Sequence, residues 1–439
     1  MSDNVRVRFA PSPTGKVHIG NIRAAIYNWL FARHTGGKFL LRVEDTDLER
    51  STPEAIRTLL DCMEWLGLGW DEEVFYQTKN VARHMECVER LIASGDAYRC
   101  EKTSRDGKTG TVVMFRMPKE GVIEYDDIVK GRMAKKAEDV GDFAIVRSDG
   151  SPIFHIANVV DDIDQGVTHI IRGDDHVENT FKHICMFKAL GAPPPRYAHL
   201  SMIVNQAGKP YSKRDGAAFV GEFRDAGYLP EALFNYLLLL GWNPGDDREV
   251  LPRDEAARLF DLTKVHVAAA KFDLKKLQWM NGEYIKRMPR GEFKREMTER
   301  LKEGGLAVPE GFDLDGLCDQ MQIRTKFLGD MPGNVDYFFR EDYSFDGKAV
   351  GKRLAKPGVG ATLLDLAGRF EALGEWKAAA LEETVKSLSH GAGMGPWVHP
   401  VRVAVSGRME GPGLFEMLEL LGRERTLARM RSAAAKYCP

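Results

Sequence analysis

The segment 5–47 alternates strand and helix patterns in a way that few folds accommodate. Residues 5–9, VRVRF, place apolar side chains at every second position, as a half-buried strand does. Apolar residues then recur at helical spacing from Asn21 until the glycines of TGG at 35–37. Residues 38–47, KFLLRVEDTD, indicate a second strand. A strand–helix–strand order of this kind predicts a parallel sheet.

The loop between the first strand and the helix lies where open α/β sheets bind their ligands. Its Gly15 and Lys16 suggest a Walker-type phosphate loop, but Ala10 and Val17 stand where that motif requires a glycine and a hydroxyl. Gly20 allows a ligand to approach the backbone. The start of the helix offers unpaired N–H groups to an anion. The loop therefore predicts anion binding without a standard P-loop.

The rest of the chain divides into a mixed region and a helical region. Residues 51–67 carry helix signals, and 100–140 are polar and glycine-rich, which indicates an insertion between two halves of the first sheet. Strand patterns return at 143–147, 152–157 and 168–176, and a helix pattern follows at 177–190. Beyond residue 225 the chain is mainly helical, with an apolar, buried helix at 229–242 and amphipathic helices at 362–374, 379–389 and 413–434.

Composition excludes several classes of protein. No apolar run reaches the roughly 18 residues of a membrane span, and the N-terminus lacks the apolar region of a secretory signal. None of the six cysteines forms a C-x-x-C pair, so neither a disulfide scaffold nor a zinc cluster has support. Scattered thiols fit a reducing cytoplasm. The net charge of −2 neither demands nor excludes a nucleic-acid partner.

Two motifs carry a resemblance to a known family. Residues 10–21, APSPTGKVHIGN, resemble the first signature of class I aminoacyl-tRNA synthetases, in the proline-rich form of the glutamyl-tRNA synthetases. Residues 208–217, GKPYSKRDGA, resemble the second signature, whose mobile lysines neutralise the departing pyrophosphate. Lys213 matches the second lysine of that motif, whereas Pro210 occupies the position of the first. Either motif alone would more often be a packed loop histidine or a solvated turn.

The resemblance implies a pocket for glutamate and ATP. Two arginines and one carboxylate at three strand ends match the two carboxylates and one ammonium of free glutamate, although the three could instead pair with one another. Phe154 stands where the family has a pocket tyrosine. The implied glutamate contacts are Arg8, Ala10, Ser12, Glu44, Phe154, Asn158 and Arg172. The implied ATP contacts are His18, Gly20, Asn21, Asp175, Ser212 and Lys213, of which His18, Gly20 and Lys213 are the catalytic candidates.

Two basic segments resemble the tRNA-binding parts of the family. Residues 271–288 resemble the segment after the catalytic domain, where Lys275 and Lys276 are candidate phosphate contacts. A plain amphipathic helix with solvated lysines fits that pattern equally well. The C-terminal segment resembles the anticodon-binding helices, with Arg423 and Arg425 as candidate tRNA contacts in a basic end that also holds Arg429 and Arg431.

The predicted fold is α/β. It has a Rossmann-like parallel-sheet catalytic domain with an inserted α+β acceptor-binding domain, followed by all-α stem-contact and anticodon-binding domains. The insertion is shorter than is usual in the family, and Cys100 has no neighbouring cysteine, so we predict no metal site and no zinc. The predicted boundaries are 1–85 and 153–205 for the catalytic halves, 86–152 for the insertion, 206–290 for the stem-contact domain and 291–439 for the anticodon-binding domains.

The sequence thus predicts a monomeric, cytoplasmic enzyme that activates L-glutamate with ATP and Mg²⁺ and charges tRNA(Glu). An enzyme that also charges tRNA(Gln) and a catalytically silent, synthetase-like RNA-binding protein are the alternatives; Pro210 and Phe154 are the hints towards the second. Less favoured are a shorter relative that glutamylates a modified tRNA base, a glutaminyl-specific enzyme, and a nucleotidyltransferase with a similar loop. None of these three accounts for the helical C-terminal part.

Overall fold

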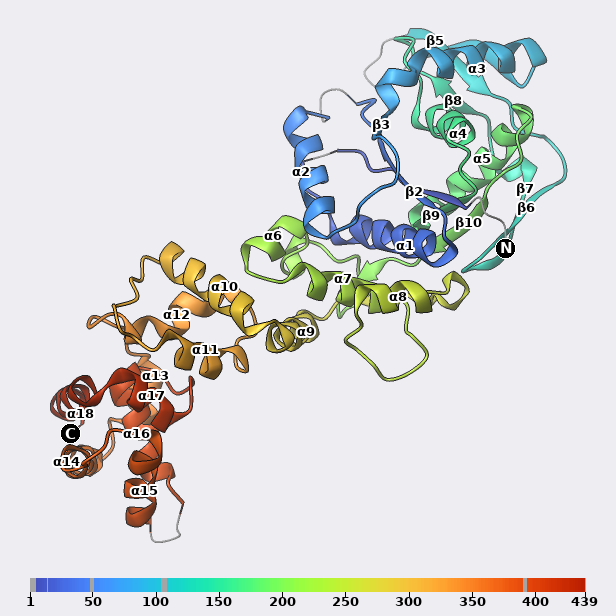
Figure 1. The fold of residues 1–439 in the computed structure, drawn as a ribbon. Helices are drawn as coiled ribbons and strands as arrows, with labels where there is room; N and C mark the ends of the chain where they lie inside the picture. Colours follow the sequence, from blue (N-terminus) through green and yellow to red (C-terminus); the bar gives the residue numbers. More distant parts are fainter. Residues whose placement is uncertain (1–4, 14, 48–50, 104–108, 390–392, 439) are drawn as a thin grey trace. The chain divides into compact units, whose positions relative to one another are not determined.

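The computed structural model describes residues 5–13, 15–47, 51–103, 109–389 and 393–438. The chain forms two compact units, and each is described by itself. Unit 1 comprises Met1–Arg224 with Pro230–Leu277, and unit 2 comprises Asp225–Leu229 with Gln278–Pro439. Strands occur in unit 1 (Figure 1, blue to green). No helix in the described ranges is long and apolar enough to cross a membrane.

The predicted strand–helix–strand segment is confirmed. Strand β1 (Arg6–Phe9) and strand β2 (Lys38–Val43) pair in parallel, and helix α1 (Ile19–Thr35) connects them. The second strand is four residues shorter than predicted, so the carboxylates after Val43 follow the strand rather than belong to it. A short parallel strand, β3 (Phe75–Tyr76), pairs with β2 on its other side.

A second sheet continues from the first. It has the order β7-β6-β10-β9, and the N–H of Thr168, just before β9, donates to the carbonyl of Arg6 on β1 at 2.9 Å. Strands β9 (His169–Gly173) and β10 (Arg196–Leu200) are parallel, whereas β6 (Val122–Asp127) and β7 (Gly131–Lys136) form a hairpin whose first strand pairs with β10. The predicted insertion therefore contributes two strands to the sheet beside the catalytic strands (Figure 1).

The remaining elements of unit 1 surround these sheets. Strands β4 (Ala97–Thr103), β5 (Thr109–Phe115) and β8 (Phe143–Val146) form a separate antiparallel sheet. The helices are α2 (Pro53–Trp65), α3 (Val81–Ser94), α4 (Phe154–Asp164), α5 (Val177–Ala189), α6 (Val220–Asp225), α7 (Pro230–Leu239) and α8 (Arg253–Leu259), and the short strands β11 (Ile203–Val204) and β12 (Ala270–Lys271) pair in parallel. Helix α7 is buried, as its apolar sequence predicted.

The strand predicted at 152–157 is wrong, because helix α4 begins at Phe154. The alternation in PIFHIA extends over only six residues. The longer pattern of Ile156, Val159 and Val160 follows helical spacing, and these side chains are buried. The helical reading places Asn158 and Asp162 four residues apart on one face of α4, where both reach the pocket network described below.

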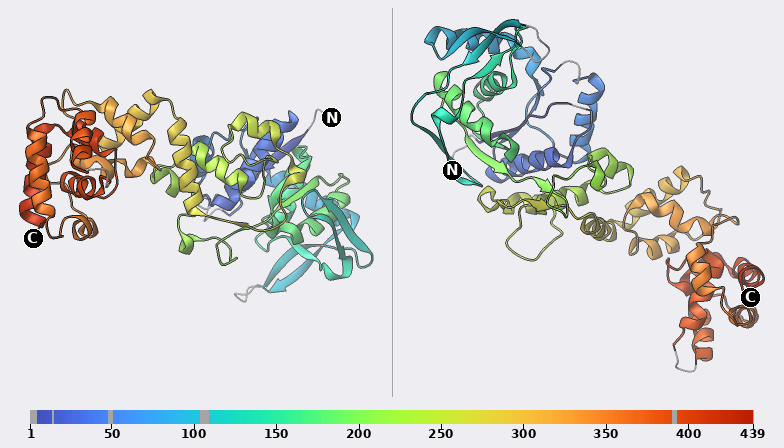
Figure 2. Two further views of the ribbon diagram at one scale, coloured as in Figure 1. Left: turned by 90° about the horizontal axis from the view of Figure 1, so that it is seen from below. Right: turned by 180° about the vertical axis from the view of Figure 1, so that it is seen from behind.

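Unit 2 has no strand among its described residues (Figure 2). Gly422, at φ +86°, divides the helix predicted at 413–434 into two. The helices are α10 (Arg290–Glu303), α11 (Leu314–Gln322), α12 (Met331–Val335), α13 (Gly347–Arg353), α14 (Val359–Glu371), α15 (Ala378–Ser389), α16 (Gly395–Ser406), α17 (Leu414–Leu421) and α18 (Arg423–Tyr437). Helix α9 (Leu274–Arg287) contains the boundary between the two units.

The turn between α1 and β2 depends on Gly37. Gly36 ends α1 in the left-handed conformation, at φ +66°, and Gly37 then passes directly against the backbone of Val5. A Cβ added at Gly37 would overlap the Val5 carbonyl oxygen, and that backbone atom cannot rotate away.

We expect Gly37→Ala to destabilise unit 1 by about 1–3 kcal/mol, the range for overpacking a tight contact. Gly69→Ala is the matched control, because a Cβ at Gly69 meets no atom within 4 Å. Urea unfolding followed by circular dichroism measures both variants. Equal midpoints for the two would contradict this account of the turn.

Candidate active site

A pocket of unit 1 with a volume of about 680 Å³ opens at the carboxyl ends of β1, β2 and β9. Most of the site residues predicted from the sequence line it. They are Arg8, Ala10, Ser12, His18, Gly20, Asn21, Glu44, Phe154, Asn158, Arg172 and Asp175. Ser212 and Lys213 are outside its lining. Sequence reasoning missed His176, Asn179 and Tyr211, which also line the pocket.

His18 holds the start of α1. Its Nδ1 accepts the N–H of Gly20 at 3.1 Å, so the proton of the neutral ring is on Nε2. Burial lowers the pKa of His18, which keeps the ring neutral at physiological pH. A Cβ at position 20 would lie 3.2 Å from His18 Nδ1, so Gly20 also allows this close cap. The pocket thus receives a helix N-terminus beside a neutral imidazole.

Arg172 is buried at the end of β9 and has no ion pair within the described part of the chain. Its Nη2 donates to Thr180 Oγ1 at 2.7 Å and to the His176 carbonyl at 3.3 Å, and its Nε lies 3.4 Å from His199 Nε2. The guanidinium also lies over the Tyr197 ring, 5.7 Å from its centroid. Burial lowers the pKa of Arg172 to about 10, which still leaves the group charged at neutral pH.

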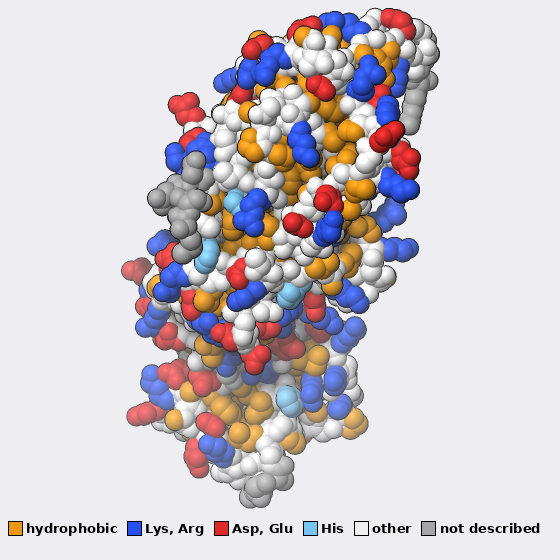
Figure 3. Space-filling view, turned by 90° about the vertical axis from the view of Figure 1, so that its right-hand side faces the viewer, with side chains coloured by type: hydrophobic (Ala, Val, Ile, Leu, Met, Phe, Trp, Pro, Cys, Tyr) orange, Lys and Arg blue, Asp and Glu red, His pale blue; other side chains and the backbone are white. Residues whose placement is uncertain are grey.

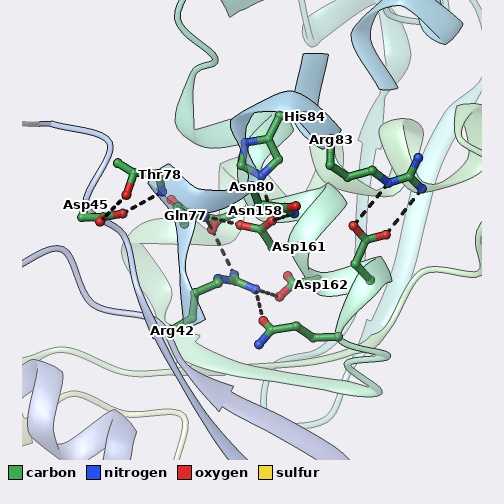
Figure 4. Close-up of polar contacts among 12 residues, drawn as sticks. Arg42, Asp45, Gln77, Thr78, Asn80, Arg83, His84, Asn158, Asp161 and Asp162 are labelled. Atoms are coloured by element: carbon green, nitrogen blue, oxygen red, sulfur yellow. Dashed lines mark hydrogen bonds and ion pairs between the residues drawn. The ribbon is translucent and has the colours of Figure 1, made fainter. Parts of the chain in front are cut away.

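The other pocket arginine, Arg8, is held by a buried acid. Asp162 Oδ1 accepts Arg42 Nη1 at 2.6 Å (Figure 4). It also accepts Arg8 Nε at 3.0 Å, so one carboxylate neutralises two guanidiniums in part. Burial on its own would raise the pKa of Asp162, but the two arginines outweigh it and hold the pKa below its usual range. Sequence reasoning missed Arg42 and Asp162; the acidic pair in the apolar helix VVDDID was the available signal.

Asn158 joins this network to Glu44. Its Oδ1 accepts Arg42 Nη2 at 3.0 Å and Gln77 Nε2 at 3.1 Å (Figure 4). Its amide N–H groups therefore point the other way, and the Glu44 carboxylate accepts a hydrogen bond from one of them. Glu44 is 8% exposed and makes no ion pair with any described residue. Burial raises its pKa to about 7, although Arg42 and Arg8 oppose the shift. Glu44 is therefore a buried acid near two arginines that forms an ion pair with neither of them.

A second network fixes the outer side of α4. Asp161 accepts hydrogen bonds from Gln77 at 2.9 Å and from Asn80 at 2.8 Å, and its carboxylate lies 2.7 Å from His84 Nε2 (Figure 4). These groups are buried or half-buried. Because Gln77 also contacts Asn158, the segment before α3 supports the pocket from behind.

Phe154 lies on the pocket wall with its ring stacked on His176, the ring centroids 5.7 Å apart. It carries no hydroxyl, so this part of the wall offers an apolar face where the family pattern has a donor. His176 and His155 both have their pKa values lowered to about 4 by burial and by nearby cations. Both imidazole rings are therefore neutral at neutral pH.

The segment after Lys213 is tied to the loop of His18. Ile19 N–H donates to the Ala218 carbonyl, and Val220 N–H donates to the Val17 carbonyl, each at 3.0 Å. Phe219 lies between the two motifs, with its ring edge-on to His18 at 5.8 Å and with Lys213 Nζ 5.4 Å from its centroid. Lys213 itself is exposed. The two predicted motifs thus meet at the pocket rim.

Comparison with known proteins decides the family. Residues 4–109 and 102–279 match the family described as tRNA synthetases class I (E and Q), catalytic domain, and residues 271–434 match the anticodon binding domain family. The chain is 40% identical to the glutamate–tRNA ligase of Francisella philomiragia over 99% of both chains. The chain belongs to the glutamate–tRNA ligases. It is a class I aminoacyl-tRNA synthetase and has glutamate–tRNA ligase activity.

Further relatives agree with this assignment. The glutamate–tRNA ligase of Francisella tularensis subsp. novicida is 39% identical over 99% of this chain and 100% of its own. A crystal structure of a glutamate–tRNA ligase from Elizabethkingia meningosepticum, in complex with its amino acid, superposes with a TM-score of 0.86 at 30% identity over 99% of both chains. The predicted α/β class I catalytic fold followed by a helical anticodon-binding part is thereby confirmed.

The arginines predicted to bind tRNA in the anticodon-binding part of this synthetase interact with other residues of unit 2. Arg423 donates to the Leu373 carbonyl and lies over Trp376, and Arg425 pairs with Glu341. Arg429 is buried and Arg431 pairs with Glu371. Basic and acidic side chains are also interspersed across the face shown in Figure 3. The tRNA role of Arg423 and Arg425 therefore stays a prediction.

The tRNA-binding lysines predicted in unit 1 differ in their surroundings. Lys275 and Lys276 are both exposed, and Lys276 pairs with Glu249, whereas Lys275 has no ion pair within the described ranges. Among the described residues, no group of three or more His, Cys, Asp and Glu side chains is arranged to hold a metal ion. Cys100 lies on β4 opposite Val112. The absence of zinc stays a prediction.

Proposed function

We propose that the pocket of unit 1 activates L-glutamate with the magnesium complex of ATP. The α-carboxylate of glutamate attacks the α-phosphate, forming glutamyl-adenylate and releasing pyrophosphate. The terminal ribose hydroxyl of tRNA(Glu) then attacks the adenylate carbonyl, forming glutamyl-tRNA and releasing AMP. This chemistry requires positioning and charge stabilisation rather than a covalent enzyme intermediate.

The proposal rests on two buried ionisable side chains that have no ion-pair partner among the described residues. Arg172 and Glu44 line the same cavity, and neither makes an ion pair with any described residue. A buried charge without a partner is costly, so such a pair is expected to meet its counter-charges on the ligand. Glutamate supplies a carboxylate for Arg172 and an ammonium for Glu44.

The amino-acid site distinguishes glutamate from glutamine through Arg172. A guanidinium binds a carboxylate with two charge-assisted hydrogen bonds, whereas an amide offers one acceptor and would direct donors towards the arginine. A charge-assisted bond is worth about 1.5–3 kcal/mol, which corresponds to roughly ten- to a hundredfold in affinity. The buried position of Arg172 supports the upper part of that range.

The phosphate side of the proposal rests on His18, the start of α1 and Lys213. Neutral His18, with its Nε2 proton, is a donor, and the N-terminus of α1 favours an anion. Asn21 and Asp175 line the same cavity. Ser212 caps the turn that presents Lys213, since its backbone N–H and its hydroxyl both contact Asp215 Oδ2, at 2.9 and 3.1 Å. Lys213 would neutralise the departing pyrophosphate.

We further propose a monomer in the cytoplasm that charges tRNA(Glu). All six cysteines are free, as suits a reducing compartment. The anticodon-binding family match at 271–434 supports binding of a whole tRNA. Parallel charging of purified tRNA(Glu) and tRNA(Gln) distinguishes the enzyme proposed here from one that charges both.

Lys213→Ala should lower the turnover number for glutamyl-tRNA formation about a hundredfold, because the leaving group loses its counter-charge. Affinity for tRNA should stay within about twofold. Lys16→Ala is the matched control, since Lys16 Nζ also lies 5.4 Å from the Phe219 ring centroid but Lys16 is not among the predicted ATP contacts. Charging is measured with labelled glutamate, ATP, Mg²⁺ and tRNA(Glu). The proposed function is refuted if the wild-type chain forms no glutamyl-tRNA.

Glutamate binding should weaken as the pH falls through about 7, because the pKa of Glu44 is raised to about 7 and the protonated acid cannot pair with an ammonium. Below that pH, kcat/KM for glutamate should fall towards about tenfold per pH unit. In Glu44→Gln, kcat/KM for glutamate should be low and should not show this fall with decreasing pH. Steady-state charging from about pH 6 to about pH 8.5 measures both profiles. A flat wild-type profile would exclude Glu44 as the ammonium partner.

A further inference from the structure

A chain of buried hydrogen bonds runs from Arg172 to a distant acid. Arg172 Nη2 donates to Thr180 Oγ1 at 2.7 Å, and that hydroxyl lies 3.0 Å from His199 Nε2. His199 Nδ1 lies 2.6 Å from Asp127 Oδ2. None of these four side chains is more than 7% exposed. The anion connected to Arg172 is thus reached through Thr180 and His199 rather than by a direct ion pair.

The strand register builds this chain. His199 on β10 is the register partner of Arg172 on β9, and Tyr197, two residues earlier, is the partner of Asp127 on β6. Side chains two residues apart share one face of a strand, and the Tyr197 and His199 rings stack at 6.0 Å. Asp127 belongs to the inserted hairpin, so the insertion supplies the last member of a chain that begins in the amino-acid pocket.

Asp127 determines which ring nitrogen of His199 carries the proton. Its Oδ1 accepts three backbone N–H groups, those of Val129 at 3.0 Å, Lys130 at 2.9 Å and His199 at 3.2 Å. Burial would raise the pKa of Asp127, but these bonds and His199 lower it, so the carboxylate is ionised. It can only accept, and His199 Nδ1 must therefore carry the proton.

The consequence is an acceptor aimed at Arg172. Burial lowers the pKa of His199, so its ring is neutral and Nε2 presents a lone pair. That lone pair faces Thr180 Oγ1 at 3.0 Å and Arg172 Nε at 3.4 Å. Nε and Nη2 of Arg172 are directed towards His199, Thr180 and the His176 carbonyl. No described residue accepts a hydrogen bond from Nη1, and Arg172 lines the cavity.

We propose that Asp127 and His199 are positioning residues that hold Arg172 in the orientation needed for the side-chain carboxylate of glutamate. The proposal rests on the proposed function, because it assigns a purpose to the geometry around the same arginine. Asp127 sets the tautomer of His199, and His199 with Thr180 orients the guanidinium. The inserted hairpin thereby determines part of the selectivity for the amino acid.

The first test reverses the tautomer with Asp127→Asn. The three backbone N–H groups hold the amide oxygen in the Oδ1 position, which turns the amide NH₂ towards His199 Nδ1. His199 must then protonate Nε2, which sets a donor against Arg172 Nε. We expect the KM for glutamate to rise about tenfold or more, with the KM for ATP within about twofold. An unchanged glutamate KM in a folded Asp127→Asn protein would overturn the proposal.

The second test separates positioning from structural support. His199→Gln reaches the Nε2 position with its amide oxygen and keeps an acceptor for Thr180 and Arg172. His199→Asn reaches the Nδ1 position and keeps only the donor to Asp127. We expect the Gln variant to stay within about threefold of the wild-type glutamate KM, and the Asn variant to rise about tenfold or more.

A purely structural role predicts the opposite order, since the Asn variant preserves the bond between β6 and β10. Equal KM values for the two variants, or a lower value for His199→Asn, would therefore overturn the proposal even if Asp127→Asn fails to fold. All variants are compared as full-length chains by glutamate-dependent charging of tRNA(Glu), with thermal melting to confirm folding. Failure of the wild-type chain to charge tRNA would refute the proposed function instead, so the two failures are distinguishable.

Discussion

The structure around the pocket depends on which buried charged side chains have an ion-pair partner and which do not. Arg8 and Arg42 share the carboxylate of Asp162, and that pairing holds α4 against the ends of β1 and β2. Arg172 is buried beside them without an acid of its own. Removing one partner of a buried ion pair costs about 3–5 kcal/mol, so a guanidinium left in this state is stable only with neutral acceptors around it. Thr180, His199 and the His176 carbonyl are those acceptors.

The same balance connects fold to function. The parallel strands end at one edge of the sheet, so residues from β1, β2 and β9 converge there. The hairpin β6–β7 extends the sheet and places Asp127 beside β10. The segment that follows the second signature is joined to the first signature loop by backbone hydrogen bonds on either side of Phe219. We infer that the amino acid binds where Arg172 and Glu44 lack ion-pair partners, and that the phosphates of ATP lie near the exposed Lys213.

The sequence was sufficient to place Arg8, Glu44 and Arg172 together, because strand patterns and strand ends are local signals. It could not supply Asp162, which lies 154 positions from Arg8, or Asp127, which lies 72 positions from His199. Such contacts are set by tertiary packing, which no local pattern encodes. The short alternation of PIFHIA misled the strand prediction for the same reason. The C-terminal arginines looked free in sequence, but carbonyls and acids distant in the chain engage them.

We infer that Arg172 binds the side-chain carboxylate of glutamate. Measuring kcat/KM for glutamate and for glutamine in the wild-type chain and in Arg172→Met tests it most directly. We expect kcat/KM for glutamate to fall about a hundredfold or more in Arg172→Met and kcat/KM for glutamine to change little, so the preference for glutamate largely disappears. A preference that survives the loss of Arg172 in a folded protein would contradict it.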